Sequence, residues 1–221
     1  MAGGADFSWL TDYAGALVNG VVTTVLLIAV TVPLGTLLSI AGAVGRRSSI
    51  AWCRALASGY VELIRNTPFL VQLFVIFFGL PSLGLRLDAM TAAILAMTVN
   101  MGAYGTEIMR AGLDAVAPGQ WEAGAALGLR RRIVFVRVVL PQALRAVYPA
   151  LASQAVIMML ESAVVSQIAV RDLTYEADLM QSRTFLSFET YAVVTLIYLG
   201  LAVLLRRVLN AGGRRLGLVA G

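Results

Sequence analysis

The segment from Pro118 to Pro141, PGQWEAGAALGLRRRIVFVRVVLP, separates two apolar stretches of the chain. Pro118 suits the first turn of a helix, where its missing N–H group would have no partner anyway. Gly128 suits the left-handed position that follows a helix end. A connection this long between apolar stretches is usually functional. We therefore interpret the segment as a short helix with an arginine-rich continuation, which together couple two compartments.

Three consecutive arginines, Arg130 to Arg132, follow the predicted short helix. Such a cluster favours the inner surface of a membrane, where anionic lipids attract it. Trp121 and Leu127 offer apolar contact, so the helix is expected to lie parallel to the membrane. An interfacial anchor helix without a protein partner is the alternative. These residues alone leave both interpretations open.

The composition is typical of an integral membrane protein. Of the 221 residues, 59% are hydrophobic and 13% are charged, and the mean hydropathy is +0.84. These values distinguish the chain from soluble globular domains. Because a membrane-spanning helix takes about 20 residues, we expect one all-α membrane domain over residues 1–221.

Missing residue types exclude several classes of site. All 17 basic residues are arginine, so there is no lysine for a Walker A phosphate-binding loop. The chain has no histidine, which excludes histidine-based acid/base catalysis and histidine metal sites. Cys53 is the single cysteine and allows neither an intrachain disulfide nor a cysteine metal cluster. We therefore expect no catalytic residue and no metal ligand on this chain.

Five apolar stretches are predicted to span the membrane. They cover residues 17–44, 55–80, 89–112, 138–164 and 188–205, with a long loop at 113–137. Most arginines fall in the first loop, the long loop and the C-terminal tail, whereas acidic residues such as Asp6 and Asp12 fall mainly on the opposite side. The positive-inside rule then places the N-terminus outside and the C-terminus in the cytoplasm.

The long loop resembles the "EAA" loop of bacterial ABC importer permeases. That pattern is E-A-A, three residues, G, nine residues, and then I-x-L-P. This chain has Glu122-Ala123-Gly124, then Gly128, and then Val138-Val139-Leu140-Pro141. The spacing agrees throughout, and the departures are Gly124 for alanine and Val138 for isoleucine.

Three further stretches narrow the resemblance to permeases for polar amino acids, the histidine, glutamine, arginine and opine type. They are the stretches RNTPFLVQ at 65–72, NMGAYGTE at 100–107 and SRTF at 182–185. The resemblance covers nearly the whole chain. It implies the type I ABC importer fold, with a five-helix transmembrane core and a cytoplasmic coupling helix.

The resemblance also implies partners. It implies a second permease subunit in a homo- or heterodimer, two cytoplasmic ATPase subunits that carry ATP and Mg, and a periplasmic solute-binding protein, all at the bacterial inner membrane. In the family the EAA helix docks into a groove of the ATPase. The residues that carry this coupling role over to the present chain are Glu122, Ala123, Gly124, Leu127, Gly128 and Arg130. The missing lysine agrees with ATP hydrolysis on a separate chain.

Ionisable residues at membrane depth are candidates for a substrate site. Arg65 lies about ten residues into the second predicted span, and arginine can hold a carboxylate with two hydrogen bonds. Thr67 and a backbone loosened around Pro68 would add donors. The alternative is a structural ion pair of Arg65 with Glu62 or Glu107. The full set of substrate-site candidates is Arg65, Asn66, Thr67, Asn100, Tyr104, Glu107, Glu161 and Ser162.

Glu161 is the second charged candidate, in the outer half of the fourth predicted span. Related permeases often read Lys-Asp-Thr-Ser where this chain reads Leu160-Glu161-Ser162-Ala163. Without the lysine, an acidic pocket would suit the amino group of a substrate. The alternative is a carboxylate that reaches the interface and is solvated. Glu107 has a structural interpretation of its own, as a brace for Arg110 or Arg145.

The sequence thus predicts the permease subunit of an ATP-driven importer for a polar or charged amino acid or a close derivative such as an opine. An alternative is a self-contained channel or proton-coupled carrier that uses Glu107 and Glu161. A membrane scaffold that transports nothing is the third possibility. The identity of the solute is not fixed by the chain, because selectivity in such systems resides largely in the binding protein.

Overall fold

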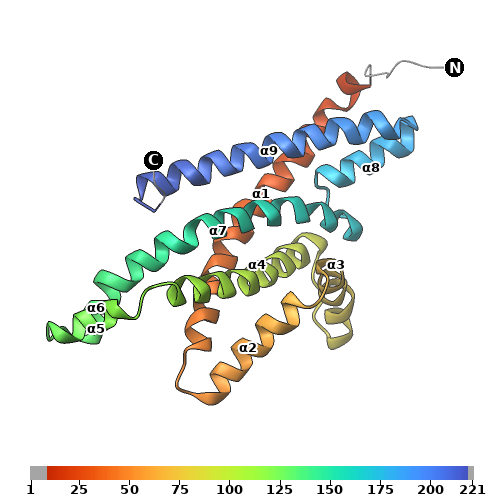
Figure 1. Ribbon diagram of the computed structural model, residues 1–221. Coiled ribbons are helices and arrows are strands. Elements are labelled where there is room, and N and C mark those ends of the chain that lie inside the picture. The colour runs from red at the N-terminus through yellow and green to blue at the C-terminus, as the bar shows by residue number, and fades with distance from the viewer. Residues whose placement is uncertain (1–8, 219–221) are drawn as a thin grey trace.

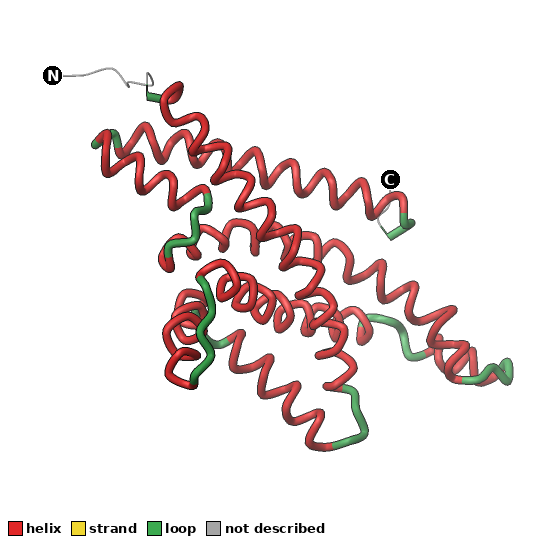
Figure 2. The backbone as a smooth tube through the Cα atoms, turned by 180° about the vertical axis from the view of Figure 1, so that it is seen from behind, coloured by secondary structure: helices red, strands yellow, loops and turns green. Residues whose placement is uncertain are grey.

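The computed structural model describes residues 9–218, and every regular element in that range is helical (Figures 1 and 2). Residues 1–8, which include Asp6, and residues 219–221 lie outside the described part. The elements are α1 (Leu10–Arg46), α2 (Ala51–Arg65), α3 (Phe69–Phe74), the π-helical turn η1 (Val75–Gly79), the 3-10 turn η2 (Leu80–Leu83), α4 (Ala89–Asp114), α5 (Gly119–Ala126), α6 (Arg131–Val134), the π-helical turn η3 (Phe135–Val139), α7 (Leu140–Glu161), the 3-10 turn η4 (Ser162–Ile168), α8 (Leu173–Thr184) and α9 (Ser187–Arg215).

Three helical segments are long and apolar enough to cross a membrane. They are Leu10–Arg46, Arg131–Ile168 and Ser187–Arg215, and the bent pair α2 with 69–83 makes a fourth. Helix α4 is about 39 Å long at 1.5 Å per residue, but it carries Glu107 and Arg110 and packs among the other helices (Figure 1). The long loop, expected over 113–137, ends earlier, because the helix that was predicted to begin at residue 138 begins at Arg131.

The stretch 55–80 was predicted as one helix and is instead broken, which corrects the prediction. Helix α2 ends at Arg65, α3 begins at Phe69, and the two segments meet at 112°. Pro68 between them is extended, and its ring disfavours a helical conformation at the residue before it, which ends α2 here. The Gln72 amide donates to the carbonyl oxygens of Ile64 at 2.7 Å and Thr67 at 2.9 Å. Gln72 therefore partners carbonyls that the break leaves open.

Small residues let α1 and α4 cross in close contact. A methyl group added to Gly35 would lie 2.5 Å from the Met101 side chain, and one added to Gly105 would overlap Ser39. The hydroxyl of Ser39 also donates to the Met101 carbonyl at 3.3 Å. In lipid, helices associate through such close packing and interhelical hydrogen bonds rather than through a hydrophobic driving force.

The polar stretch after the fourth predicted span folds as α8, which packs its apolar side against α1 and α9 (Figure 1). Asp172 caps α8 and is fully buried: its carboxylate accepts from the Tyr175 N–H at 2.9 Å and from the Tyr198 hydroxyl at 3.2 Å. Burial raises the pKa of this carboxyl group to about 6, and the hydrogen bonds offset only part of that shift.

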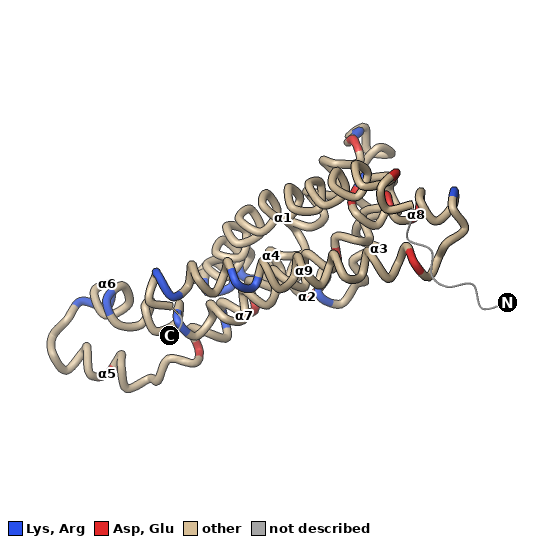
Figure 3. The backbone as a smooth tube through the Cα atoms, turned by 90° about the horizontal axis from the view of Figure 1, so that it is seen from above, with Lys and Arg blue, Asp and Glu red and all other residues tan. Residues whose placement is uncertain are grey.

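Charged residues are distributed unevenly along the molecule. Figure 3 shows most arginines toward the end that holds α5, α6 and the C-terminus, and most acidic residues toward α8. The two ends of the helical bundle therefore present opposite charge to their surroundings. This is the asymmetry that orients membrane proteins.

Asp172 makes a pH-dependent contribution to stability. Its folded pKa of about 6 lies above the ordinary value of 3.8, so the folded chain binds more protons than the unfolded one between these limits. Stability should therefore fall as the pH rises from about 4 to 6 and stay level above about 7. Asp172→Asn keeps the cap but does not titrate, so the difference in melting temperature between pH 5 and pH 8 should shrink in detergent. Asp12→Asn, an exposed charge on α1, should retain the wild-type difference. Identical pH profiles for wild type and Asp172→Asn would contradict this assignment.

Candidate functional site

Glu107 on α4 gathers three arginines from three helices. Its carboxylate pairs with Arg46 of α1 and with Arg110 of α4, whose Nε lies 2.9 Å from Glu107 Oε1. Arg65 at the end of α2 approaches to 4.0 Å from Oε2, and its guanidinium lies 5.6 Å from the centre of the Tyr104 ring. The structure thus brings together the predicted candidates Arg65, Tyr104 and Glu107. It also shows the ion pairs with Arg65 and Arg110 that were the structural alternative.

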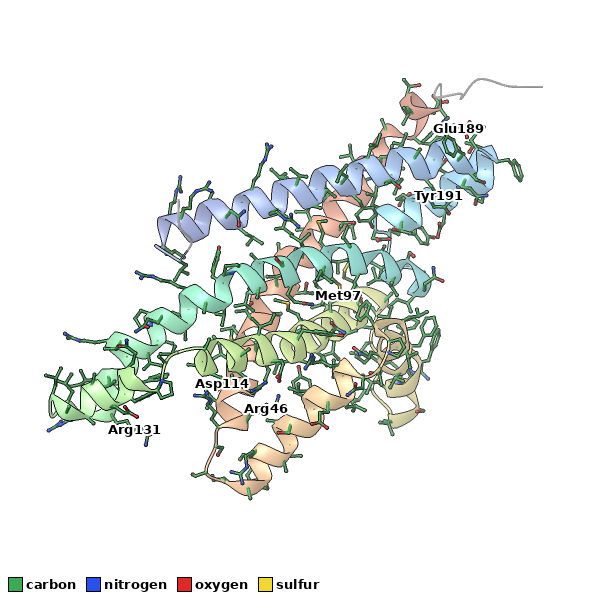
Figure 4. All side chains as sticks on the ribbon, viewed as in Figure 1. Arg46, Met97, Asp114, Arg131, Glu189 and Tyr191 are labelled. Atoms are coloured by element: carbon green, nitrogen blue, oxygen red, sulfur yellow. The ribbon has the colours of Figure 1, made fainter. Side chains whose placement is uncertain are left out.

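Asp114, at the end of α4, extends this cluster. It accepts from Arg110 Nη1 at 2.7 Å and from Arg47 Nη2 at 2.6 Å. Figure 4 shows Arg46 and Asp114 on the side of α4 that faces α2. Four arginines around two carboxylates leave two positive charges without a counter-charge inside the cluster. Arg65 has the weakest ionic contact of the four and a side chain that is 42% exposed, so it is the arginine most free to bind an external carboxylate.

Arg145, which was the other expected partner of Glu107, lies elsewhere. It donates to the Gly217 carbonyl oxygen at 3.1 Å, beyond the end of α9. Spacing along one helix identified Arg110, whereas the predicted contact between Glu107 and Arg145 is replaced by that with Arg46. Glu62, the other proposed partner of Arg65, has no ion pair among residues 9–218.

Asn100 is held at the break between α2 and α3 by a residue that was not a candidate. Asn100 Nδ2 donates to Gln72 Oε1 at 3.0 Å, and both side chains are buried. The Asn100 Oδ1 atom is buried without a hydrogen-bond partner. Gln72 was detectable as the amide inside the apolar run Leu70-Val71-Gln72-Leu73, where a polar side chain must find a partner.

Asn66 and Thr67 turn back onto their own helix. The Asn66 amide donates to the Glu62 carbonyl at 2.8 Å, and the Thr67 hydroxyl donates to the Leu63 carbonyl at 2.9 Å. Both side chains therefore satisfy the carbonyl end of α2. They support the position of Arg65 rather than joining its ionic cluster.

Glu161 lies apart from this cluster, at the end of α7. Its Oε2 atom is buried and has no hydrogen-bond partner, while the neighbouring Ser162 hydroxyl donates to the Met159 carbonyl at 2.6 Å. No hydrogen bond or ion pair within residues 9–218 joins Glu161 or Ser162 to the arginines around Glu107. The residue as a whole is only half-buried, so a partner is lacking for this one oxygen, whose burial costs free energy. In the same range no three carboxylate or thiol groups are placed to hold a metal ion.

Helix α5 is packed onto the base of the next long helix. Trp121 stacks on Phe135 with ring centres 6.2 Å apart, and Arg131 lies 5.5 Å above the Trp121 ring. Val134 and Val139 are buried beneath them. Figure 4 shows Arg131 at this end of the molecule, and Figure 1 shows α5 and α6 side by side.

The predicted coupling residues divide into an outward and an inward group. Five of them are exposed: Glu122, Ala123, Leu127, Gly128 and Arg130. Gly124 faces α6 instead, because a methyl group added there would overlap Val134. Gly128 has a φ of 68°, the left-handed conformation expected after a helix end.

The segment Arg131–Ile168 joins this base to Glu161. It is 38 residues of almost uninterrupted helix, about 57 Å at 1.5 Å per residue. Val134 and Phe135, which pack against α5, and Glu161 therefore lie on one element. A displacement at one end can reach the other.

Comparisons with known proteins agree with this geometry. A family model described as "Binding-protein-dependent transport system inner membrane component" matches residues 31–217. A probable glutamine ABC transporter permease of Bacillus subtilis (strain 168) is 35% identical over 198 residues, which cover 90% of this chain and 92% of that protein. An octopine transport system permease of Rhizobium radiobacter is 33% identical over 91% of this chain and 85% of its own length.

Solved structures show the same fold. The crystal structure of an amino acid ABC transporter with histidines superposes with a TM-score of 0.90 at 38% identity, covering 96% of this chain and all of the other. The MetNI methionine ABC transporter, in an inward-facing form, superposes with a TM-score of 0.76 at 20% identity, covering 95% and 99% of the two chains. The second comparison bears on the fold alone.

Removal of the Glu107 charge should destabilise the chain markedly. Glu107→Gln leaves Arg46, Arg65 and Arg110 without their shared counter-charge, and we expect a loss of about 2–3 kcal/mol. Asp114→Asn, at a carboxylate that is 48% exposed, should cost about 0–1 kcal/mol. Thermal unfolding in detergent at matched ionic strength measures both. Equal losses for the two variants would show that Glu107 does not hold the cluster together.

Proposed function

The chain belongs to the family of binding-protein-dependent transport system inner membrane components and is a permease of the amino acid ABC importer type, and on this premise we propose how it assembles and where it meets its substrate. It functions as the translocation subunit of an importer for a polar or charged amino acid or an opine-like derivative. The observation that carries the proposal is the continuous helix that leads from the packed α5 base to Glu161.

The proposed assembly places ATP hydrolysis on a separate subunit. The chain has no lysine for a phosphate-binding loop, so an ATPase dimer would carry ATP and Mg. Helix α5 and the loop that follows it would dock on that ATPase through Glu122, Leu127 and Arg130, which are exposed. Leu127 is 76% exposed, as expected of an apolar residue that awaits a partner surface. A second permease subunit and a periplasmic binding protein complete the importer.

The proposed topology follows from the arginines. The loop after α1, the α5–α6 region and the end of α9 carry most of them (Figure 3) and would lie in the cytoplasm. The N-terminus would then be periplasmic, and α8 would lie on the periplasmic side. Residues 1–221 would form one membrane domain.

The proposed substrate interactions use two opposite charges. Arg65, at the edge of a cluster with surplus positive charge, would attract a carboxylate. Glu161, whose Oε2 has no partner, would receive an amino group or a cationic side chain. Relatives named for glutamine, arginine, cystine and octopine transport are consistent with a substrate that carries both charges.

A proton-coupled carrier that uses Glu107 and Glu161 has less support than the ATP-driven importer. Glu107 is engaged by Arg46, Arg65 and Arg110, which favour its charged form and oppose proton uptake. A scaffold without transport gives no reason for the buried Oε2 atom of Glu161 to lack a partner. Liposomes that contain only this chain should show no ATPase activity and no amino acid flux. Flux without ATP would favour the carrier.

Glu161→Gln should impair transport without loss of the fold. Glutamine fills the same space but carries no negative charge, so we expect ATP-driven uptake to fall at least tenfold for a substrate whose amino group pairs with Glu161. The measurement is uptake of labelled glutamine, arginine, glutamate and histidine into liposomes holding the complete importer. Glu189→Gln at the start of α9, labelled in Figure 4, is the control and should transport normally. Unchanged uptake of all four solutes by Glu161→Gln would refute the role of Glu161.

Gly124→Ala should weaken coupling through a steric effect on α6. The added methyl group overlaps Val134, and overpacking of this kind costs about 1–3 kcal/mol. ATP-driven uptake should fall several-fold, and the double variant Gly124→Ala with Val134→Ala should regain most of it. Gly119→Ala in the same helix meets nothing within 4 Å and should be neutral. A double variant no better than Gly124→Ala alone would contradict the steric mechanism.

A further inference from the structure

A purely apolar groove lies between α1, α7 and α9, away from the two charged sites. Its volume is about 340 Å³, within the range of ligand-binding sites. Aliphatic, proline and methionine side chains line it, among them Val25 and Pro33 of α1, Met159 of α7, and Leu204 and Val208 of α9. Val25, Leu204 and Val208 are each about half exposed, so the groove opens to the surroundings of the helices.

Two arginines, Arg145 and Arg215, lie beyond the end of the groove that is nearer the C-terminus of α9. Residues 201, 208 and 215 are seven apart, so Arg215 lies on the groove-lining face of α9, about 10 Å beyond Val208. Arg145 of α7 joins it from the other wall, because its Nε lies 3.1 Å from the carbonyl oxygen of Gly217. Both side chains are exposed, and neither has an ion pair within the described residues 9–218.

Helices α7 and α9, which form two walls of the groove, are joined between its apolar part and the two arginines. The Tyr148 hydroxyl donates to the carbonyl oxygen of Leu209 at 2.6 Å, which ties α7 to α9 there. Leu209 also lines the groove. An occupant of the groove would therefore run along the exposed side chains of Leu204, Val208 and Arg215. This row of side chains is apolar in the membrane interior and cationic at the interface.

We propose that this groove is a binding site for an anionic phospholipid, with an acyl chain between α1, α7 and α9 and the headgroup phosphate on Arg145 and Arg215. Basic pockets at the ends of membrane helices bind anionic headgroups, and arginine holds a phosphate with two parallel hydrogen bonds. None of the residues that line the groove is among the proposed substrate or docking residues. The proposal rests on the proposed topology only for the choice of membrane leaflet, which would be the cytoplasmic one.

Charge favours a lipid over a second copy of this chain as the occupant. Two copies with the same orientation are related by an axis along the membrane normal, so residues at equal depth meet. A second copy seated on this groove would bring its own Arg145 and Arg215 opposite these two arginines, so positive charge would meet positive charge. An anionic phosphate brings the opposite charge, and its acyl chain matches the apolar wall.

The test measures retention of dioleoyl phosphatidylglycerol by the purified full-length chain in detergent, by native mass spectrometry, against dioleoyl phosphatidylcholine. Wild type should retain the anionic lipid preferentially. Arg145→Gln and Arg215→Gln should each weaken its binding about fivefold. Ala29→Phe, which fills the groove from an exposed position on α1, should reduce retention of the acyl chain. Arg54→Gln, in an exposed arginine near the start of α2, is the matched control and should bind as wild type.

Three results would overturn the proposal. One is equal retention of the two lipids by wild type. Another is an effect of Arg54→Gln as large as that of Arg215→Gln, which would indicate general charge attraction. The third is an Ala29→Phe variant that retains the anionic lipid fully but loses self-association, which would make the groove an interface between copies.

Discussion

The close crossing of α1 and α4 is the constraint on which the remaining structure depends. Gly42 of α1 allows Thr106 of α4 to come into contact, since any side chain at residue 42 would overlap the threonine hydroxyl. One turn after Gly42 comes Arg46, and directly after Thr106 comes Glu107, so the crossing delivers this ion pair. Packing of small residues, which drives helix association in lipid, thereby sets the position of the charged cluster.

Contacts of helix α4 also position two other parts of the chain, the break between α2 and α3 and the loop that carries α5. In the N-terminal half of α4, Asn100 donates a hydrogen bond to Gln72 and so fixes the break at which α2 ends with Arg65. Near the C-terminal end of α4, Gly112 fits closely against Val147 of α7. The chain leaves α4 directly into the loop that carries α5. The break that carries Arg65 and the helix α5 are therefore both positioned by α4, although no polar contact within residues 9–218 joins them.

Much of the fold could be predicted, because lipid selects long apolar stretches and an EAA loop has a recognisable spacing. The family, the fold class and the permease function were confirmed on this basis. The 112° break was not foreseen, since neighbouring helices can repair a proline in a membrane helix, and its outcome rests on Gln72. The partner Arg46 lies 61 residues from Glu107, a contact that helical spacing cannot reveal. Helix α8 was hidden by its polarity, because its apolar side emerges only against α1 and α9.

The chain leaves two electrostatic demands unmet, and they are of opposite sign. Four arginines surround two carboxylates at one place, and the Oε2 atom of Glu161 is buried alone at another. The buried oxygen of Glu161 costs stability because it lacks a partner, whereas Arg65 keeps contact with solvent. An arginine and a glutamate that merely stabilised the fold would have satisfied each other. They stand apart instead, although Gln72, Ser39 and Thr106 find partners inside the bundle, and local rules of this kind are most often broken where a protein binds or acts.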